Sequence, residues 1–195
     1  MHPPIIFKIL GILLILFSIL GNIPPILVSI QYDDGMMMAF VYSLLIIGSS
    51  GLVLLLFTAR TRKELGTKDG FLVVTLFWAV LGTAGCLPLL LSSAVELSIT
   101  DAVFESLSGL TTTGATVISG LDSLPKSILF YRQLLQWLGG LGIIVLAMAL
   151  LPMLGVGGMQ LYRAESPGPI KDRKLVPRLA ETAKALWYIY FSLTI

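Results

Sequence analysis

Residues 36–57 form an apolar run without a charged side chain or a histidine. A helix needs about 20 apolar residues to cross the hydrocarbon core of a membrane, and only helices and closed barrels satisfy the backbone there. The chain of 195 residues is 56% hydrophobic and 12% charged, which is too apolar for a soluble domain. The sequence therefore predicts an all-α integral membrane protein.

Further segments have the length and composition of membrane spans, namely residues 5–30, 71–92 and 127–151. The first contains Gly21-Asn22 and Pro24-Pro25, which predict a broken or kinked helix. It could also be a cleaved signal peptide, with Lys8 as its basic end and residues 9–20 as its core. Because it lacks small residues in a cleavage pattern, we favour a retained span. In the span at residues 71–92, Gly82, Gly85 and Pro88 are predicted packing and kink positions.

The basic residues predict the orientation of these spans, because cytoplasmic loops are enriched in Lys and Arg. Eleven of the thirteen basic residues fall on one side of the predicted topology: Lys8, Arg60, Arg62, Lys63, Lys68, Arg163, Lys171, Arg173, Lys174, Arg178 and Lys184. The other side carries mostly acids, namely Asp33, Asp34, Glu96, Asp101, Glu105 and Asp122, with Lys126 and Arg132. We therefore expect a cytoplasmic N-terminus.

Residues 100–110 are apolar but too short to span. A helix of this length measures about 16 Å, roughly half of the hydrocarbon thickness. If the segment did cross, the basic stretch after residue 151 would lie outside the cell. We therefore predict a re-entrant segment, which enters the membrane from outside and returns.

A run of small hydroxyl residues around a glycine follows this segment: Thr111, Thr112, Thr113, Gly114, Ala115 and Thr116. Non-helical backbone at membrane depth must be buried in protein or line a watery cavity. Potassium filters use rows of backbone carbonyls in place of the hydration shell, and glycine permits the dihedral angles that such a row needs. The loop is therefore a candidate filter strand, and a plain surface turn is the alternative.

Other chemistries find little support in the sequence. The single cysteine, Cys86, and the single histidine, His2, provide no disulfide framework, no histidine metal pair and no histidine-based catalytic group. No Gly-rich phosphate loop is present, so a nucleotide would bind a partner and not this chain. We expect neither an enzyme nor a nucleic-acid-binding protein, and no cofactor.

Several separated motifs resemble the TrkH-type potassium-uptake proteins of bacteria, within the Trk/Ktr/HKT superfamily. They are FESLSGLTTTGATVISGLDSLP, YRQLLQWLGGLGIIVLAMALLP, GVGGMQLYRAESPGP, KDGFLVVTLFW and RLAETAKALWYIY. The resemblance implies four repeats of outer helix, re-entrant pore helix with filter strand, and inner helix, preceded by two additional helices.

Carried onto this chain, the resemblance divides it into five parts. Residues 1–58 would form the two leading helices, 59–70 a cytoplasmic basic loop, 71–151 the first repeat, 152–182 a cytoplasmic connection and 183–195 the start of a second repeat. Because the last apolar run is too short to span, we interpret the chain as an N-terminal fragment.

The resemblance also implies the ligands and partners. Potassium would be bound through the backbone carbonyls of Thr111 and Thr112, with Thr113 and Gly114 continuing the filter. A homodimer in the bacterial inner membrane is implied, with a cytoplasmic nucleotide-binding regulatory subunit of the TrkA type. The basic stretch 163–184 would contribute to that docking surface or contact anionic membrane lipid.

Individual polar and glycine residues leave alternatives open. Glu105 would either bond the loop backbone behind the filter, or add negative potential at the outer mouth, or be a solvated carboxylate. Arg132 is expected to pair with Asp122 or Glu105 rather than to touch the ion. Gly139, Gly140 and Gly142 would permit close helix packing or act as a gating hinge.

The favoured function is potassium uptake through a pore of which this chain supplies one wall. A non-conducting assembly or anchoring subunit is the alternative from another class. A secondary transporter with a re-entrant hairpin is a further possibility.

Overall fold

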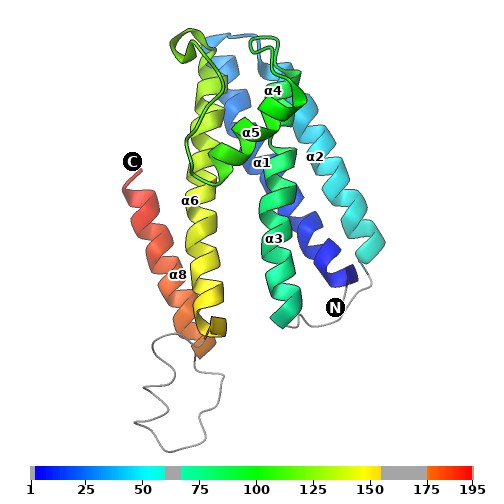
Figure 1. Ribbon diagram of the computed structural model, residues 1–195, viewed down its shortest axis with the longest axis vertical. Coiled ribbons are helices and arrows are strands. Elements are labelled where there is room, and N and C mark those ends of the chain that lie inside the picture. Colours follow the sequence, from blue (N-terminus) through cyan, green and yellow to red (C-terminus); the bar gives the residue numbers. More distant parts are fainter. Residues whose placement is uncertain (1–2, 60–66, 155–174, 195) are drawn as a thin grey trace, which may run out of the picture. The chain divides into compact units, whose positions relative to one another are not determined.

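The computed structural model describes residues 3–59, 67–154 and 175–194, and all regular elements within these ranges are helices (Figure 1). The helices are α1 (Pro3–Tyr32), α2 (Met37–Thr58), α3 (Thr67–Ala84), α4 (Leu87–Leu91), α5 (Ile99–Leu110), the 3-10 helix η1 (Leu121–Ser123), α6 (Lys126–Leu154) and α8 (Leu175–Ser192).

The chain divides into two compact units, Met1–Gly139 and Gly140–Ile195. The first unit contains α1 to α5, η1 and the first part of α6, and it holds the hydrophobic core and the Thr-Gly loop. The second unit contains the rest of α6 together with α8.

Among the described residues, three segments are long and apolar enough to cross a membrane: Pro3–Tyr32, Met37–Thr58 and Asp69–Leu91. They correspond to the first three predicted spans. The fourth predicted span, residues 127–151, lies within the single helix α6. The predicted all-helical membrane architecture is confirmed at this level.

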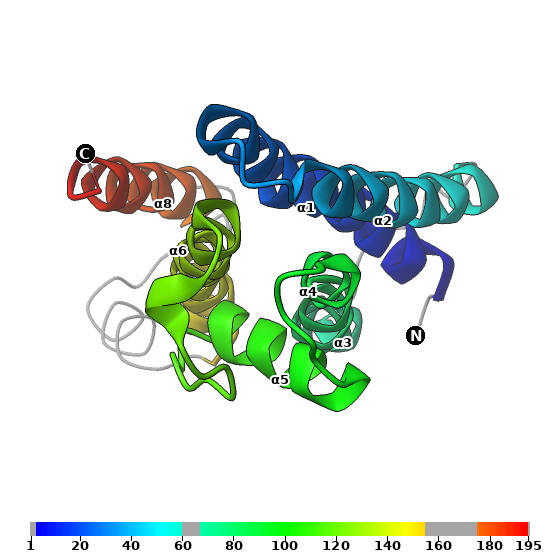
Figure 2. The same ribbon diagram turned by 90° about the horizontal axis from the view of Figure 1, so that it is seen from above.

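Helices α1 and α2 pack against each other as an antiparallel pair (Figures 1 and 2). A Cβ atom on Gly11 would lie 2.9 Å from the Gly51 carbonyl oxygen, and one on Gly51 would lie 2.8 Å from that of Gly11. Only glycine allows backbones to come this close, as in other membrane helix pairs. Of the predicted break or kink at Pro24-Pro25, the break is wrong, because α1 continues to Tyr32. The two prolines remove only two backbone donors from this long, packed helix.

The third predicted span, residues 71–92, is not one continuous helix. It is interrupted at Gly85 and Cys86, between α3 and α4. Pro88 lacks an N–H group and cannot extend the hydrogen bonding of α3. The carbonyl of Gly85, which lies in this interruption, accepts a hydrogen bond from the buried hydroxyl of Tyr131, at 2.6 Å. The predicted kink positions Gly85 and Pro88 therefore lie at an actual break.

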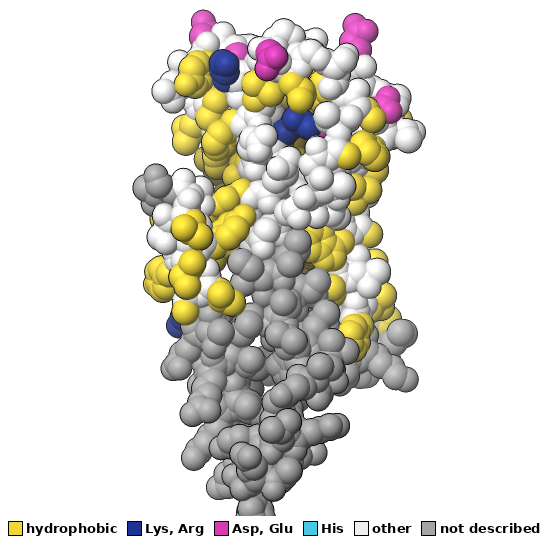
Figure 3. Space-filling view, turned by 60° about the vertical axis from the view of Figure 1, so that its left-hand side comes forward, with side chains coloured by type: hydrophobic (Ala, Val, Ile, Leu, Met, Phe, Trp, Pro, Cys, Tyr) yellow, Lys and Arg dark blue, Asp and Glu magenta, His cyan; other side chains and the backbone are white. Residues whose placement is uncertain are grey.

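Acidic side chains gather at one end of the first unit (Figure 3). This end is formed by the connections between α1 and α2, between α4 and α5, and around η1 (Figure 1). Exposed carboxylates there include Asp33, Glu96 and Asp122. We refer to it as the acidic end.

The second unit begins within α6. A Cβ atom on Gly140 would overlap the hydroxyl oxygen of Tyr190 in α8, so this glycine permits close helix packing. Helix α8 spans Leu175–Ser192 and includes the start of the last predicted apolar run. Residues 60–66 and 155–174, which hold most of the predicted basic connections, lie outside the described residues.

Candidate functional site

The short helix α5 is stabilised at its start by a side-chain cap. The Ser98 hydroxyl accepts a hydrogen bond from the backbone N–H of Asp101, at 3.1 Å, and donates one to the Asp101 carboxylate, at 2.7 Å. This reciprocal pairing satisfies a free donor of the first turn. The helix has 12 residues and is therefore about 18 Å long. The predicted short helix of residues 100–110 is confirmed.

The C-terminal end of α5 lies deep in the first unit. A Cβ atom on Gly139 would overlap the carbonyl oxygen of Leu110, the last residue of α5. Gly139 lies thirteen residues after Lys126, where α6 begins at the acidic end, or about 20 Å along that helix. Figure 2 shows α5 crossing from α3 to α6. The chain therefore enters and returns at the same end of the unit.

The backbone after α5 adopts unusual dihedral angles. Thr112 and Gly114 both have positive φ, of 59° and 74°. Glycine accepts this region freely, but a β-branched residue such as Thr112 rarely does. Such a conformation costs about 1–3 kcal/mol and is concentrated at functional sites. The N–H groups of Thr111 and Thr112 are bonded to α5 carbonyls, so the turn is anchored to its helix.

Four consecutive carbonyl oxygens, those of Thr111, Thr112, Thr113 and Gly114, accept no hydrogen bond from the described part of the chain. The next carbonyl, of Ala115, accepts one from the Ser108 hydroxyl at 2.7 Å. All these loop residues are exposed. The C-terminal end of α5 precedes them, and the negative end of a helix dipole favours cations over anions. Carbonyls of this kind can replace the hydration shell of an ion.

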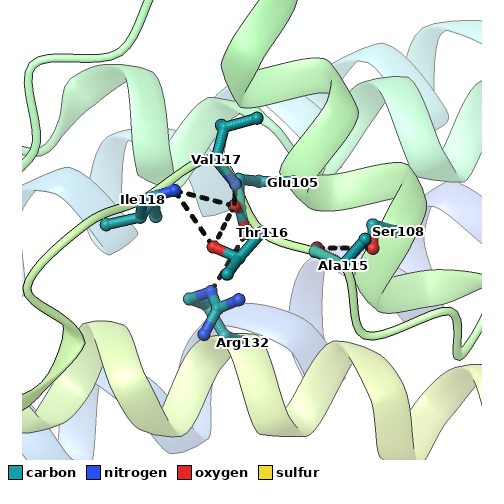
Figure 4. A network of polar contacts seen from close by, with 7 residues as sticks. All are labelled: Glu105, Ser108, Ala115, Thr116, Val117, Ile118 and Arg132. Carbon is teal, nitrogen blue, oxygen red and sulfur yellow. Dashed lines mark hydrogen bonds and ion pairs between the residues drawn. The ribbon is translucent and has the colours of Figure 1, made fainter.

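Glu105 binds the extended segment that follows the Thr-Gly loop, residues 116–118, which we call the returning strand (Figure 4). Its side chain is buried, and one carboxylate oxygen accepts hydrogen bonds from the Thr116 hydroxyl and from the backbone N–H groups of Val117, at 2.6 Å, and Ile118, at 3.4 Å. Of the open alternatives for Glu105, the bond to the loop backbone is confirmed. A solvated carboxylate is wrong, because loop donors and Arg132 surround it.

Arg132 completes the arrangement from α6. Its Nε donates to the second carboxylate oxygen of Glu105 at 3.1 Å, and both side chains are buried. Of the two predicted partners, Glu105 is therefore the one found, and Asp122 remains exposed near η1. A buried charge is tolerated in this way only when it is paired and hydrogen-bonded.

The sequence did not predict two residues that hold α5, the loop and α6 in place. Ser108 lies three residues after Glu105, so both side chains project from one face of α5 toward the loop. This spacing was a usable signal. Asp34 was the second: its carboxylate accepts from the Ser127 N–H in the first turn of α6, at 2.9 Å. Nothing in the local sequence connects these two residues.

No three His, Cys, Asp or Glu side chains are grouped to hold a metal ion in the ranges that the structure describes. The free oxygens of the Thr-Gly loop described above are backbone carbonyls. Such oxygens differ in chemistry from the carboxylates that hold resident metal ions.

A chain whose described elements are all helices and include three apolar segments of membrane length is an integral membrane protein with several spans. The sequence profile of the family described as "TrkH: Cation transport protein" matches residues 36–195. The chain belongs to this family of transporters, which are not enzymes.

Named relatives are similar along nearly the whole chain. The "Trk system potassium uptake protein TrkH" of Halomonas elongata is 63% identical over 190 residues, which cover 97% of this chain and 39% of that protein. The protein of the same name from Escherichia coli K12 is 57% identical and covered to 40%. "Trk system potassium uptake protein TrkG" of that strain is 42% identical. The chain thus spans about 40% of the length of these curated relatives.

A solved structure has the same fold. The crystal structure of the potassium transporter TrkH from Vibrio parahaemolyticus matches all of this chain and 38% of its own, with a TM-score of 0.84 and 52% sequence identity.

Proposed function

We propose that this chain forms the first part of a potassium-uptake protein and that its Thr-Gly loop supplies one wall of the ion path. Thr111, Thr112, Thr113 and Gly114 bind potassium through their backbone carbonyls. The observation that carries the proposal is the row of four carbonyls that no described residue bonds, at the end of a helix about half as long as a membrane span. The potassium-uptake names of the relatives support the choice of ion.

The wider assembly follows from the same proposal. The acidic end faces outward and the N-terminus lies in the cytoplasm of a bacterial cell, with the protein in the inner membrane. Three further repeats outside this chain complete the path around the ion. The protein is a homodimer with a cytoplasmic nucleotide-binding regulatory subunit of the TrkA type. The exposed apolar side chains of α1 and α2 contact membrane lipid.

The test is ion flux through the full-length protein in liposomes. Gly114→Ser should reduce rubidium flux and its preference over sodium, because a side chain at φ +74° strains the loop where the ion binds. Gly120→Ser is the matched control, since Gly120 also has positive φ (+71°) but lies beyond the carbonyl row. Its flux should stay near that of the wild type.

Two outcomes would contradict the proposal. A wild-type protein that carries no rubidium flux would be a non-conducting assembly subunit. Unchanged flux and ion preference in Gly114→Ser would mean that the loop does not line the path.

A further inference from the structure

The face of α5 that carries Glu105 and Ser108 forms hydrogen bonds with successive residues of the loop. Ser108 accepts through its carbonyl from the N–H groups of Thr113, at 2.9 Å, and Gly114, at 3.3 Å, and its hydroxyl bonds the Ala115 carbonyl. The Glu105 carboxylate accepts hydrogen bonds from the residues that follow, beginning with Thr116. Each residue of the strand directly after the carbonyl row is thus bonded to one face of one helix.

The chemistry at Glu105 requires a carboxylate. Donors approach it from two directions: the returning strand donates to one oxygen, and Arg132 donates to the other. Both oxygens must accept. A glutamine has one acceptor oxygen and an NH₂ group, so one of the two directions would present donor against donor. In the sequence, Arg132 lies 27 residues after Glu105 and Val117 lies 12 residues after it.

We propose that the Glu105–Arg132 pair is a positioning device that sets the ion preference of the carbonyl row. Arg132 fixes the orientation of the carboxylate, and the carboxylate fixes the strand that begins two residues after Gly114. The inference rests on the proposed function for its transport readout. Neither side chain touches the ion.

The rival role for the same pair is purely structural, as a link between α5 and α6. The two roles differ in what an apolar replacement would do. Replacing a buried ion pair by apolar side chains of similar size often preserves or increases stability. It cannot supply an acceptor to Thr116 and Val117. Stability and ion preference should therefore separate in such a variant.

The main experiment uses the full-length protein with Glu105→Met combined with Arg132→Met. The amount of folded protein should be close to that of the wild type. The ratio of rubidium to sodium flux should fall by about tenfold, which corresponds to about 1.4 kcal/mol of relative ion binding. A wild-type ratio in this folded double variant would overturn the inference and leave only the structural role.

A rescue variant gives the opposite expectation. Glu105→Gln alone should lose ion preference, because its oxygen pairs with Arg132 and its NH₂ group faces the strand. In Glu105→Gln combined with Arg132→Gln, the amide oxygen is free to face the strand, and the preference should return to within about threefold of the wild type. A folded double amide variant without this recovery would overturn the inference.

Hydrogen exchange tests the positioning without any transport. The Val117 amide should exchange slowly in the wild type and faster in the double methionine variant, because its acceptor is gone. Equal exchange would overturn the inference even in a protein that conducts. Absence of flux in the wild type, with the exchange difference present, would contradict the proposed function alone.

Discussion

The Nε atom of Arg132 lies 3.1 Å from a carboxylate oxygen of Glu105, and the two side chains are only 9% and 1% exposed. The pair connects α6 to α5 immediately behind the loop that follows α5. Because both charges are buried, each depends on the other for compensation.

Removal of one partner should therefore be costly. Arg132→Met leaves the Glu105 carboxylate buried without its counter-charge and should lower the free energy of unfolding by about 3–5 kcal/mol. Thermal melting of the full-length protein in detergent measures the loss. The matched control is Lys126→Met at the exposed start of the same helix, which should melt like the wild type. Equal melting of both variants would contradict the burial argument.

A methyl group at Gly139 should separate α5 from α6. A Cβ at this position would overlap the backbone oxygen of Leu110, which has no rotamer to change. Gly139→Ala should cost about 1–3 kcal/mol, as overpacking does elsewhere. Gly21→Ala is the control, since its nearest neighbour would be 3.9 Å away, and it should gain up to about 1 kcal/mol of helix propensity. Thermal melting measures both changes in stability. A Gly139→Ala protein as stable as Gly21→Ala would refute the close contact between Gly139 and Leu110.

The positive φ of Thr112 predicts a substitution that should increase the stability of the protein. Thr112→Gly removes the clash of a β-branched side chain in the left-handed region and should raise the stability of the protein by about 1 kcal/mol. Thr113→Gly, at a neighbouring position without positive φ, should instead destabilise through added chain entropy. Melting temperatures of the two variants should therefore move in opposite directions. A shift in the same direction would argue against strain at Thr112.

Asp34 gives the protein a pH-dependent contribution to stability. Burial raises the pKa of this carboxyl, but hydrogen bonds from Ser29, Ser127 and Met36 outweigh it and hold the pKa below its usual value. Its contribution is therefore fully present above about pH 3.9, the pKa in an unfolded chain, and is lost as pH falls through the lower folded pKa.

The measurement compares melting temperatures of the wild type and Asp34→Asn as a function of pH. The difference between them should be constant near neutral pH and shrink below about pH 4. Asp33→Asn serves as the control, because the neighbouring Asp33 side chain is exposed to solvent; its curve should follow the wild type. A difference that persists unchanged at low pH would mean that the charge of Asp34 contributes nothing.

Much of the helical framework could be predicted from the sequence because it depends on local properties. Run length and the absence of charge are sufficient to place α2 within one residue, and the length of the shorter run before the Thr-Gly loop places α5 equally well. The interruption between α3 and α4 was signalled only as a kink. Whether the chain breaks here depends on whether carbonyls left outside the helices find another donor, and for Gly85 that donor is the hydroxyl of the distant Tyr131.

The state of Glu105 could not be predicted for a similar reason. Its neighbours in sequence are compatible with an exposed or a buried carboxylate. The decision depends on donors that arrive when the chain turns back at Gly114 and when α6 passes behind the loop. Pairing across a fold is a tertiary property, and one sequence leaves it open.

The contact between Asp34 and Ser127 also has a consequence for biosynthesis. The acceptor is made 93 residues before the amide that it receives. At typical translation rates of about 5–20 residues per second, it precedes its donor by roughly 5–20 s. The leading helical hairpin can thus be in the bilayer, with its carboxylate in place, before the start of α6 leaves the ribosome. The earliest helices of the chain would then guide the insertion of a later one.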